Sequence, residues 1–511
     1  MTDTARWTAG DTHPAARASA RERPRARGGG RRAATTGDGT GDGTGHGTVD
    51  TAGTAGDSVG AMGLGLHTDR YELTMLTAAL ADGTARSQCT FEVFTRRLPD
   101  GRRFGVVAGT GRVLEAVADL AFDPDELRWL ADAGVVDAPT AQFLADYRFG
   151  GEIHGYPEGE LYFPGSPVLS VRGTFADAVV LETVVLSILN HDSAIASAAA
   201  RMVLAADGRP LVEMGSRRTH EDAAVAAARA TWLAGFAGTS NLAAGRAHGI
   251  PTLGTAAHAF TLLHTTERAA FQAQVDALGP DTTLLVDTYD IATGVATAVE
   301  VAGTSLGAVR IDSGDLPVLA RRTRAQLDAA GAHATRILLS GDLDEYAIAG
   351  LGAAPVDTFG VGTSVVTGSG SPTAGFVYKL VEVDGRPVVK RSAGKETRGG
   401  TKWVVRRHRH TGTATEEVVG TGAPPVVHPP DRRVDRLLFR DGAPVEGADD
   451  LAAARERVRA GLVTLPWDGV KLSRGEPAIE TTVVASPPVA TGAAGPVVAG
   501  PGGVDADGAG S

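Results

Sequence analysis

The residues best suited to chemistry stand at the ends of short apolar runs. Residues 309–316, VRIDSGDL, place Arg310 and Asp312 among apolar residues, and a Ser-Gly pair then begins a predicted helix. Backbone amides at a helix N-terminus bind anions, and aspartates can hold Mg²⁺ or ribose hydroxyls. Asp315 could serve only as the cap of that helix. Arg310 and Asp312 would be costly on a buried strand without a ligand or partner, which favours a functional site.

A histidine follows another such run. In residues 254–258, GTAAH, His258 lies one turn beyond a short predicted strand that begins at Pro251. A histidine at this position could transfer a proton or a phosphoryl group, and an ordinary hydrogen-bonded histidine would show the same pattern.

Anion-binding groups follow three further runs. Arg217 and Arg218 come after a Gly-Ser turn and offer planar forks for a carboxylate or phosphate, unless they are a solvated pair at a helix start. Residues 340–344, SGDLD, and 359–364, FGVGTS, repeat a design of strand, glycines and small hydroxyls, which in a barrel commonly forms a phosphate cup. Four lysines in 375–405 indicate a basic loop near a polyphosphate or a solvated β-hairpin; they are Lys379, Lys390, Lys395 and Lys402.

The elements that carry these residues have the pattern of an α/β protein. Helical stretches such as 221–236 and 316–330 separate several apolar runs, which lie at 210–214, 251–254, 284–287, 308–312, 337–341 and 358–362. Strands that alternate with helices pair in parallel, and six such units predict a closed or nearly closed barrel. The functional groups come just after the strands, at the face where barrel enzymes place their sites.

Composition excludes several classes of protein. The 511 residues carry a net charge of −11, which gives no reason to expect nucleic acid as a partner. The single cysteine, Cys89, rules out an intrachain disulfide, suits a reducing cytosol, and is expected to be a small core residue. The most apolar stretch, 178–200, is interrupted by Glu182, His191 and Asp192, which predicts a buried helix rather than a membrane span. P-loop, dinucleotide-binding and zinc-binding motifs are absent from the sequence.

The two ends of the chain differ from its middle. Residues 1–60 hold eight arginines before position 33 and a GDGT-GDGT-GHGT repeat, with almost no large apolar residues. Such a segment cannot bury enough surface to offset its chain entropy, so it is predicted to be a disordered leader. Residues 486–511, rich in Gly, Ala, Pro and Val, are predicted to be a disordered tail.

The order of nine segments resembles the nicotinate phosphoribosyltransferase family: TDRYELTM, FEVFTRRLP, EMGSRR, GTSN, GTAAH, VDTYD, VRIDSGDL, SGDLDE and FGVGTSVVT. The resemblance extends from about residue 67 to about residue 402. It implies a type II phosphoribosyltransferase fold, an irregular α/β barrel with an N-terminal α+β domain and a C-terminal segment packed on that domain. The corresponding bounds are 61–175 for the N-terminal domain, 176–375 for the barrel with its phosphoribosyl site, and 376–485 for the C-terminal segment.

The resemblance also implies a reaction. Nicotinate and phosphoribosyl pyrophosphate would give nicotinate mononucleotide and pyrophosphate, with ATP as co-substrate and Mg²⁺ as cofactor. ATP would phosphorylate His258, which makes the enzyme an ATP-coupled ligase for the first step of NAD salvage from nicotinate. Family members are usually dimers with the site at the subunit interface, so a cytoplasmic homodimer is expected.

Roles carried over by position complete the expected site. Tyr71 of the partner subunit would stack on the pyridine ring, while Thr255 and Arg310 would hold nicotinate. Arg217 would bind the carboxylate or the nucleotide phosphate, and Asp312 would be a catalytic ligand of ribose or metal. The 5-phosphate would be held by Gly341, Gly362 and Thr363. The family commonly has an aromatic residue where this chain has Met214, so ring stacking on that side is expected to be weaker, although methionine packs against aromatic rings.

Four other interpretations were considered. Nicotinamide phosphoribosyltransferases resemble the chain in fold and histidine, but they have an aspartate at the position of Ser240, and a neutral hydroxyl suits a carboxylate substrate better. A quinolinate phosphoribosyltransferase would be shorter and more basic. Residues 284–294 resemble the pyrophosphate loop of type I enzymes, but Asp287 and Asp290 are three apart rather than adjacent. A non-catalytic regulator would be expected to lose the histidine or the Arg-x-Asp pair, and the chain has both.

Overall fold

The computed structural model describes residues 64–390 and 398–484. The predicted leader at 1–60, the predicted tail at 486–511 and Lys395 lie outside these residues. The α-helices are α1 (Arg70–Asp82), α2 (Thr110–Asp119), α3 (Pro124–Asp132), α4 (Ala138–Ala145), α5 (Phe175–Val179), α6 (Glu182–Ala206), α7 (Glu221–Ala234), α8 (Leu242–His248), α9 (His258–Leu263), α10 (Glu267–Leu278), α11 (Ile291–Ala302), α12 (Leu316–Ala329), α13 (Glu345–Gly350), α14 (Thr363–Val366) and α15 (Leu451–Thr464).

The strands form the sheets described below. They are β1 (Gln88–Thr95), β2 (Gly105–Val106), β3 (Glu152–Gly155), β4 (Leu161–Tyr162), β5 (Leu169–Thr174), β6 (Leu211–Glu213), β7 (Gly238–Thr239), β8 (Thr283–Leu285), β9 (Ala308–Ile311), β10 (Arg336–Leu339), β11 (Thr358–Val361), β12 (Phe376–Val383), β13 (Arg386–Pro387), β14 (Lys402–His408), β15 (Ala414–Thr421), β16 (Arg432–Arg433), β17 (Arg436–Arg440), β18 (Ala443–Pro444) and β19 (Glu480–Val484).

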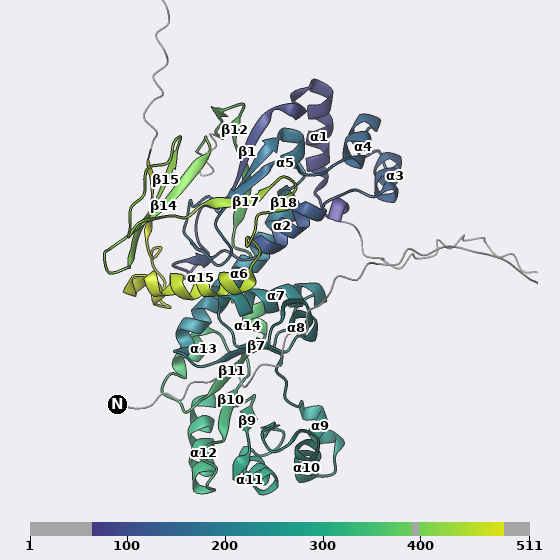
Figure 1. Cartoon of the computed structure of the whole chain (residues 1–511). Coiled ribbons are helices and arrows are strands. Elements are labelled where there is room, and N and C mark those ends of the chain that lie inside the picture. The colour runs from purple at the N-terminus through teal and green to yellow at the C-terminus, as the bar shows by residue number, and fades with distance from the viewer. Residues whose placement is uncertain (1–63, 391–397, 485–511) are drawn as a thin grey trace, which may run out of the picture. The chain divides into compact units, whose positions relative to one another are not determined.

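A six-stranded parallel sheet carries the predicted chemistry. Its strand order is β7-β6-β11-β10-β9-β8, and all neighbouring strands run parallel. Thr252 adds an isolated parallel bridge to Thr239 at the β7 edge. Helices α10, α11 and α12 pack beside β8, β9 and β10 (Figure 1). The sheet has two edges, β7 and β8, so the barrel is open rather than closed. The predicted irregular α/β barrel is confirmed.

Most of the predicted barrel elements are present. Five of the six apolar runs become strands of this sheet, because they bury residues such as Val309, Ile337 and Phe359 completely. The run at 251–254 forms only the bridge, and β7 was not predicted because it has just two residues. Helices α7 and α12 occupy the predicted stretches, and Asp315 caps α12 by accepting a hydrogen bond from the Val318 amide at 3.3 Å.

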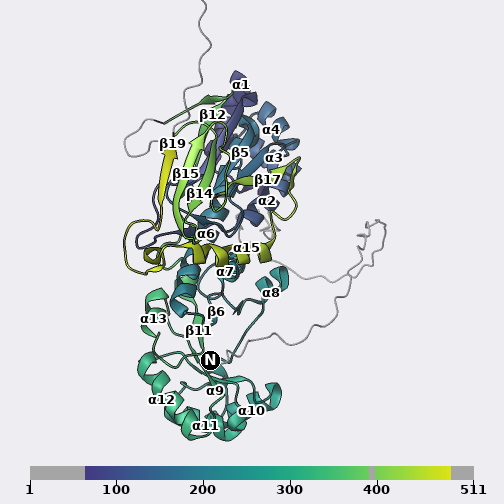
Figure 2. The ribbon, with the colours of Figure 1, turned by 60° about the vertical axis from the view of Figure 1, so that its left-hand side comes forward.

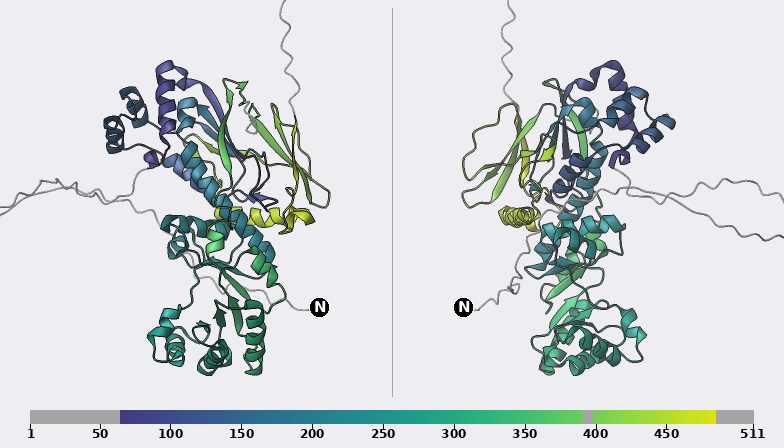
Figure 3. Two further views of the ribbon diagram at one scale, coloured as in Figure 1. Left: turned by 180° about the vertical axis from the view of Figure 1, so that it is seen from behind. Right: turned by 45° about the vertical axis from the view of Figure 1, so that its right-hand side comes forward.

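A seven-stranded antiparallel sheet forms the second part of the fold. Its order is β13-β12-β1-β5-β3-β17-β18, so strands from the C-terminal segment pair directly with β1 and β3 of the N-terminal segment. Helices α1 to α5 lie on one side of this sheet, and the four-stranded sheet β16-β14-β15-β19 lies on the other (Figures 2 and 3). The C-terminal segment therefore contributes strands to the same sheet as the N-terminal strands.

Buried ion pairs join the four-stranded sheet to the residue just before β4. Arg406 on β14 is 1 % exposed and donates from Nη1 to Glu160 at 2.6 Å and from Nη2 to Glu417 at 2.5 Å. Arg432 also binds Glu160, at 2.8 Å. Burial by itself raises the pKa of Glu160, but the charges of Arg406 and Arg432 outweigh it and lower the pKa to about 2. Removing one partner would leave an uncompensated buried charge, so the network fixes the four-stranded sheet against the chain at Glu160.

Helix α6 connects the two hydrophobic cores. Val185 and Leu189 near its start pack into the core of the seven-stranded sheet, whereas Ile195 and Met202 pack into the core of the parallel sheet. By length and composition alone, Phe175–Ala206 could cross a membrane, but 61 % of its most apolar window is buried inside the protein. This confirms the prediction of a buried helix at 178–200.

Candidate active site

The side chain of Arg310 is fixed by three neighbours at the carboxyl ends of the parallel strands. Its Nε donates to Ser340 Oγ at 2.8 Å, Nη1 to Thr255 Oγ1 at 2.9 Å, and Nη2 to Asp312 Oδ1 at 2.9 Å. Ser340 also donates to Asp312 Oδ1, at 2.5 Å. A guanidinium has five N–H groups, so two remain available to a ligand. The arrangement is that of an oriented fork for a planar anion.

The carboxylate of Asp312 is kept ionised by this network. Burial alone would raise its pKa, but the hydrogen bond from Ser340 and the positive charge of Arg310 outweigh burial, and the pKa lies below the ordinary value. His258 contributes in the same direction, which shows that its ring lies within electrostatic range of Asp312. The structure therefore brings Thr255, His258, Arg310 and Asp312 into one group.

Asp287 and Thr288 complete the surroundings of the histidine. His258 begins α9, and its Nδ1 lies 3.2 Å from Thr288 Oγ1. Asp287 Oδ2 accepts hydrogen bonds from the Asp312 amide and the Ser313 hydroxyl, both at 2.8 Å. Asp287 Oδ1 is buried and has no hydrogen-bond partner in the described part of the chain. This oxygen is available to a ligand or metal ion that enters the site.

Gly341, Gly362 and Thr363 lie at the ends of the adjacent strands β10 and β11. Gly341 has φ of +104°, and a Cβ at this position would lie 2.2 Å from the carbonyl oxygen of Asp312. Only glycine allows the two loops to approach this closely. Gly362 precedes α14, whose first residue, Thr363, is exposed. The predicted phosphate cup thus has adjacent loops and an accessible hydroxyl.

The segment after β6 lies beside the same strand ends. Met214 is half-buried and packs against β11, where a Cβ at Gly360 would be 2.9 Å from the sulfur. The amide of Ser240 donates to the Glu213 carbonyl at 2.8 Å, which places its half-buried side chain next to β6. Arg217 and Arg218 are both exposed, so the fold does not single out either one as the ligand-binding arginine.

A buried carboxylate that sequence reasoning did not select lies beneath these residues. Glu213 is fully buried at the end of β6 and accepts hydrogen bonds from the Gly215 amide and the Thr239 hydroxyl. Burial raises the pKa of Glu213, and these two hydrogen bonds offset the increase only in part. The carboxylate links β6 to β7 and shapes the turn that leads to Arg217.

Within one chain, Tyr71 does not lie with the other predicted site residues. It lies on α1, beside the seven-stranded sheet, with 45 % of its surface exposed. Burial and the neighbouring Glu182 raise the pKa of its hydroxyl. Its exposure leaves the ring accessible to another molecule.

The alternatives left open for other residues are settled by burial. Lys402 is neither in a solvated hairpin nor free for a polyphosphate, because its ammonium is 2.5 Å from the buried carboxylate of Glu92. Lys379 lies 3.4 Å from Glu182. Cys89 is 5 % exposed, and burial followed by the charge of Asp384 raises the pKa of its thiol to about 11, which confirms a core residue.

Comparison with known proteins identifies the family. The model of the nicotinate phosphoribosyltransferase N-terminal domain matches residues 66–190. The chain is 64 % identical over 429 residues to nicotinate phosphoribosyltransferase pncB1 of Mycobacterium tuberculosis, an alignment that covers 82 % of the chain and 95 % of that relative. The chain belongs to the nicotinate phosphoribosyltransferase family.

Other nicotinate phosphoribosyltransferases agree in sequence and in fold. The Homo sapiens enzyme is 30 % identical over 430 residues, which cover 71 % of the chain and 80 % of that relative. The crystal structure of human nicotinic acid phosphoribosyltransferase has a TM-score of 0.70 at 25 % identity, covering 82 % of the chain and 97 % of that structure. Nicotinate-nucleotide pyrophosphorylase from Pyrococcus furiosus has a TM-score of 0.65 at 27 % identity, covering 78 % and 95 %.

Three residues of this candidate site were not selected from the sequence. Asp287 ends the run LLVD, the same pattern of strand and carboxylate that pointed to Asp312, but residues 284–294 were considered only as a type I loop. Ser340 and Thr288 are small hydroxyls without a distinctive sequence signal. Their contacts with Arg310, Asp312 and His258 depend on which strands are neighbours.

Proposed function

We propose that this protein joins nicotinate to phosphoribosyl pyrophosphate, giving nicotinate mononucleotide and pyrophosphate, and that ATP drives the reaction through phosphorylation of His258. The observation that carries the proposal is the Arg310 fork, which is held by Thr255, Ser340 and Asp312 and keeps two N–H groups for a ligand. A planar carboxylate such as that of nicotinate can accept hydrogen bonds from both of these groups. The 64 % identity to a named nicotinate phosphoribosyltransferase supports the same substrate.

The chain's residues would act mainly by positioning. The ring nitrogen of nicotinate attacks the anomeric carbon as the bond from that carbon to the pyrophosphate oxygen breaks, and pyrophosphate leaves with the electron pair. The nitrogen needs no base, so the rate depends on the alignment that Arg310 and Thr255 give to the ring. The ionised Asp312 would bind ribose hydroxyls, and the loops of Gly341, Gly362 and Thr363 would hold the 5-phosphate.

ATP coupling is assigned to His258. Its ring would accept the γ-phosphoryl group of ATP, with ADP as the leaving group, and water would later hydrolyse the N–P bond to release phosphate. Phosphorylation adds roughly two negative charges close to Asp312 and Thr288. Such a local charge change can alter affinity for substrate and product and thereby couple ATP hydrolysis to product release.

Mg²⁺ fits the acidic residues of the site. The described residues contain no group of three or more His, Cys, Asp or Glu side chains that could hold a metal ion. Mg²⁺ commonly binds one or two carboxylates together with substrate phosphates, and the unpartnered oxygen of Asp287 and the ionised Asp312 supply such carboxylates. When bound, the ion would stabilise negative charge on the leaving pyrophosphate.

The exposed ring of Tyr71 supports a homodimer, with Tyr71 of the partner subunit stacking on the pyridine ring. The proposal places this dimer in the cytoplasm and makes its reaction the entry of nicotinate into NAD synthesis.

Product analysis tests the proposal. The wild-type protein and His258→Ala would be incubated with phosphoribosyl pyrophosphate and either nicotinate or nicotinamide, with and without Mg-ATP. We expect the wild-type protein to form nicotinate mononucleotide from nicotinate and to form no product from nicotinamide. In His258→Ala, we expect ATP to stimulate the reaction no longer, and γ-labelled ATP to leave no acid-labile radiolabel on the protein. Turnover of nicotinamide instead would contradict the substrate, and unchanged ATP stimulation in His258→Ala would contradict the role of the histidine.

A further inference from the structure

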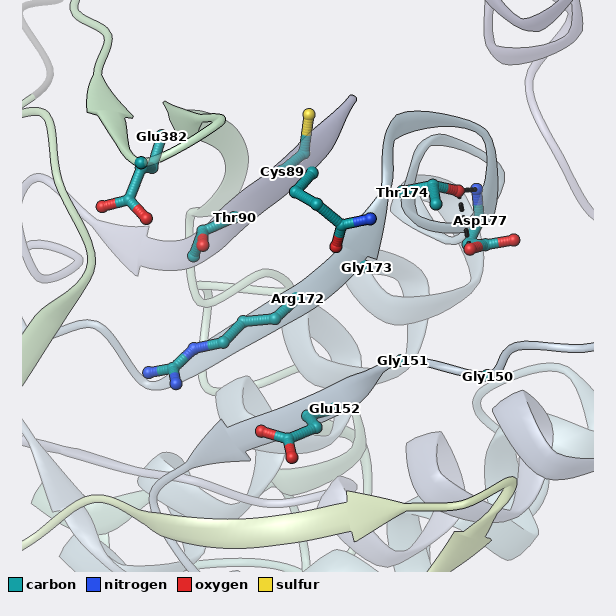
Figure 4. A pocket seen from close by; sticks show the side chains of 12 residues that line it. Cys89, Thr90, Gly150, Gly151, Glu152, Arg172, Gly173, Thr174, Asp177 and Glu382 are labelled. Atoms are coloured by element: carbon teal, nitrogen blue, oxygen red, sulfur yellow. Dashed lines mark hydrogen bonds between the residues drawn. The ribbon is translucent and has the colours of Figure 1, made fainter. Parts of the chain in front are cut away.

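A cavity of about 450 Å³ lies on the seven-stranded sheet, separate from the parallel strands that carry His258 (Figure 4). Its walls come from the first residues of β1, the end of β5, the start of β3 with the preceding Gly150–Gly151, and the turn after β12. The volume is within the range of about 300–1,000 Å³ that is usual for small-molecule sites. Neither the predicted site nor the phosphoribosyl chemistry uses any of these residues.

Strand register places four polar side chains in one row across this surface. Thr90 on β1 pairs with Arg172 on β5 and with Glu382 on β12, and Arg172 pairs with Glu152 on β3. Residues directly opposite each other on neighbouring strands point to the same face. Figure 4 accordingly shows the guanidinium of Arg172 between Glu152 and the Thr90–Glu382 side of the cavity. Val171, the next residue on β5, points to the opposite face and is completely buried.

The guanidinium of Arg172 is a partly buried cation that has no hydrogen-bond or ion-pair partner among the described residues. Its Nε is buried and makes no hydrogen bond within residues 64–390 and 398–484. Leaving a buried donor unsatisfied is unfavourable, and more so for a charged group. The cost is offset if a ligand accepts hydrogen bonds from this fork, for which a carboxylate has the matching geometry.

The neighbouring carboxylates are bonded to other residues and not to Arg172. Glu152 binds His154 and Arg440, each at 2.8 Å. Within the described residues, Glu382 accepts one hydrogen bond, from the Thr401 amide at 3.0 Å, through Oε2. No described carboxylate is therefore hydrogen-bonded to Arg172, whose charge lies within electrostatic range of the buried Glu92, and Glu382 has an oxygen that can accept a further donor.

The balance of charge restricts the kind of ligand. Among the described residues, the lining contains one cation, Arg172, and three carboxylates, Glu152, Asp177 and Glu382. A dianionic phosphate would be repelled by these carboxylates, whereas a ligand with one carboxylate and one ammonium satisfies both signs of charge. We propose that this cavity binds a small zwitterion of the α-amino acid class, with its carboxylate on Arg172 and its ammonium toward Glu382.

Binding by the full-length protein tests this proposal. Single L-α-amino acids would be screened by thermal shift and each hit measured by calorimetry, alongside its deaminated acid, its decarboxylated amine and inorganic phosphate. We expect at least one amino acid to bind. Its deaminated acid and its decarboxylated amine should each bind about tenfold more weakly or not at all. The backbone amides that the ligand protects from hydrogen exchange should include those of residues 88–90 and 172–174. A panel without any binder, or phosphate binding as tightly as the best amino acid, would overturn the proposal.

Variants locate the ligand and allow for folding effects. Arg172→Gln should weaken binding by about tenfold or more, because a bidentate charged contact is lost. Arg172→Lys keeps the charge and should bind at intermediate strength, while Glu382→Gln should weaken the amino acid but not its deaminated acid. Arg436→Gln, at an exposed arginine of β17 that does not line the cavity, and Arg310→Gln, in the barrel, should bind as wild type. Folding is checked by circular dichroism. If Arg172→Gln does not fold, Arg172→Lys and Glu382→Gln test the proposal in its place. Unchanged affinity for the amino acid in both of these variants would overturn the proposal.

Discussion

Replacing Ser340 by alanine removes one hydroxyl that both accepts from Arg310 Nε at 2.8 Å and donates to Asp312 Oδ1 at 2.5 Å. Ser340 is 3 % exposed, so water cannot readily take its place. Hydrogen bonds to charged groups contribute about 1.5–3 kcal/mol each, and the direct Arg310–Asp312 ion pair remains after the change. We therefore expect transition-state stabilisation to fall by about 1.5–3 kcal/mol, which is roughly a 10- to 150-fold loss of kcat/KM for nicotinate.

The same substitution should move the pH dependence. The Ser340 hydrogen bond is the largest of the interactions that lower the pKa of Asp312. Without it that pKa rises, so the ionised form needed for activity is lost at a higher pH when the solution is acidified. The acid limb of the kcat/KM profile should therefore shift to higher pH, while the alkaline limb stays in place.

Steady-state kinetics of nicotinate mononucleotide formation measure both effects. The KM for nicotinate should rise more than the KM for phosphoribosyl pyrophosphate, since Arg310 is proposed to hold the acid. Ser305→Ala is a control, because among the described residues the Ser305 side chain bonds only the Ala302 carbonyl, at 3.3 Å, before β9 begins. A folded Ser340→Ala protein with wild-type KM and an unmoved acid limb would refute the view that Ser340 orients Arg310.

Three further substitutions or reactions test the fold. Arg406→Ala leaves Glu417 buried without its partner and should reduce the free energy of unfolding by about 3–5 kcal/mol in urea denaturation. Gly341→Ala combines positive φ with a clash against the Asp312 carbonyl, so activity should fall at least about tenfold along with a lower Tm. Cys89 should react slowly with iodoacetamide at pH 8 in the native protein and quickly in urea, as followed by mass spectrometry.

Matched variants separate the specific effects from general ones. Arg407→Ala removes an exposed pair with Glu416 on the same strand as Arg406 and should cost less than about 1 kcal/mol. Gly331→Ala has positive φ but its nearest neighbour is 3.6 Å away, so it should retain activity. Equal losses in Arg406→Ala and Arg407→Ala, or in the two glycine variants, would contradict the structural explanation. Rapid alkylation of native Cys89 would contradict its place in the core.

Local signals explain what could be predicted. Apolar runs of four or five residues followed by carboxylates or glycines located β6, β8, β9, β10 and β11, because a fully buried parallel strand needs apolar residues on both faces. Asp315 was recognised as a possible cap because capping depends on a residue only three positions away. His258, Arg310 and Asp312 were selected because strand ends of parallel sheets face the same side.

Contacts between residues far apart in the chain explain what could not be predicted from the sequence. Lys402 looked like a surface lysine, yet its partner Glu92 is 310 residues earlier in the chain. Ser340 gained its position only because β10 lies beside β9 in the sheet. The C-terminal strands β12 and β17 pair with β1 and β3, a pairing that no local pattern encodes.

The sequence by itself thus determined the α/β class, the elements of the barrel and most residues at its carboxyl-terminal edge, since these depend on periodicity and on the residue that ends each strand. Only the tertiary structure decided that Thr255, Ser340 and Asp312 together orient Arg310, and that Asp287 keeps an unpartnered oxygen beside them. It also decided that the buried Nε of Arg172, in a cavity on the other sheet, has no hydrogen-bond partner within the described part of the chain. The physical reason is that hydrogen bonds and buried charges join residues through strand order and register, which spacing along the chain does not specify.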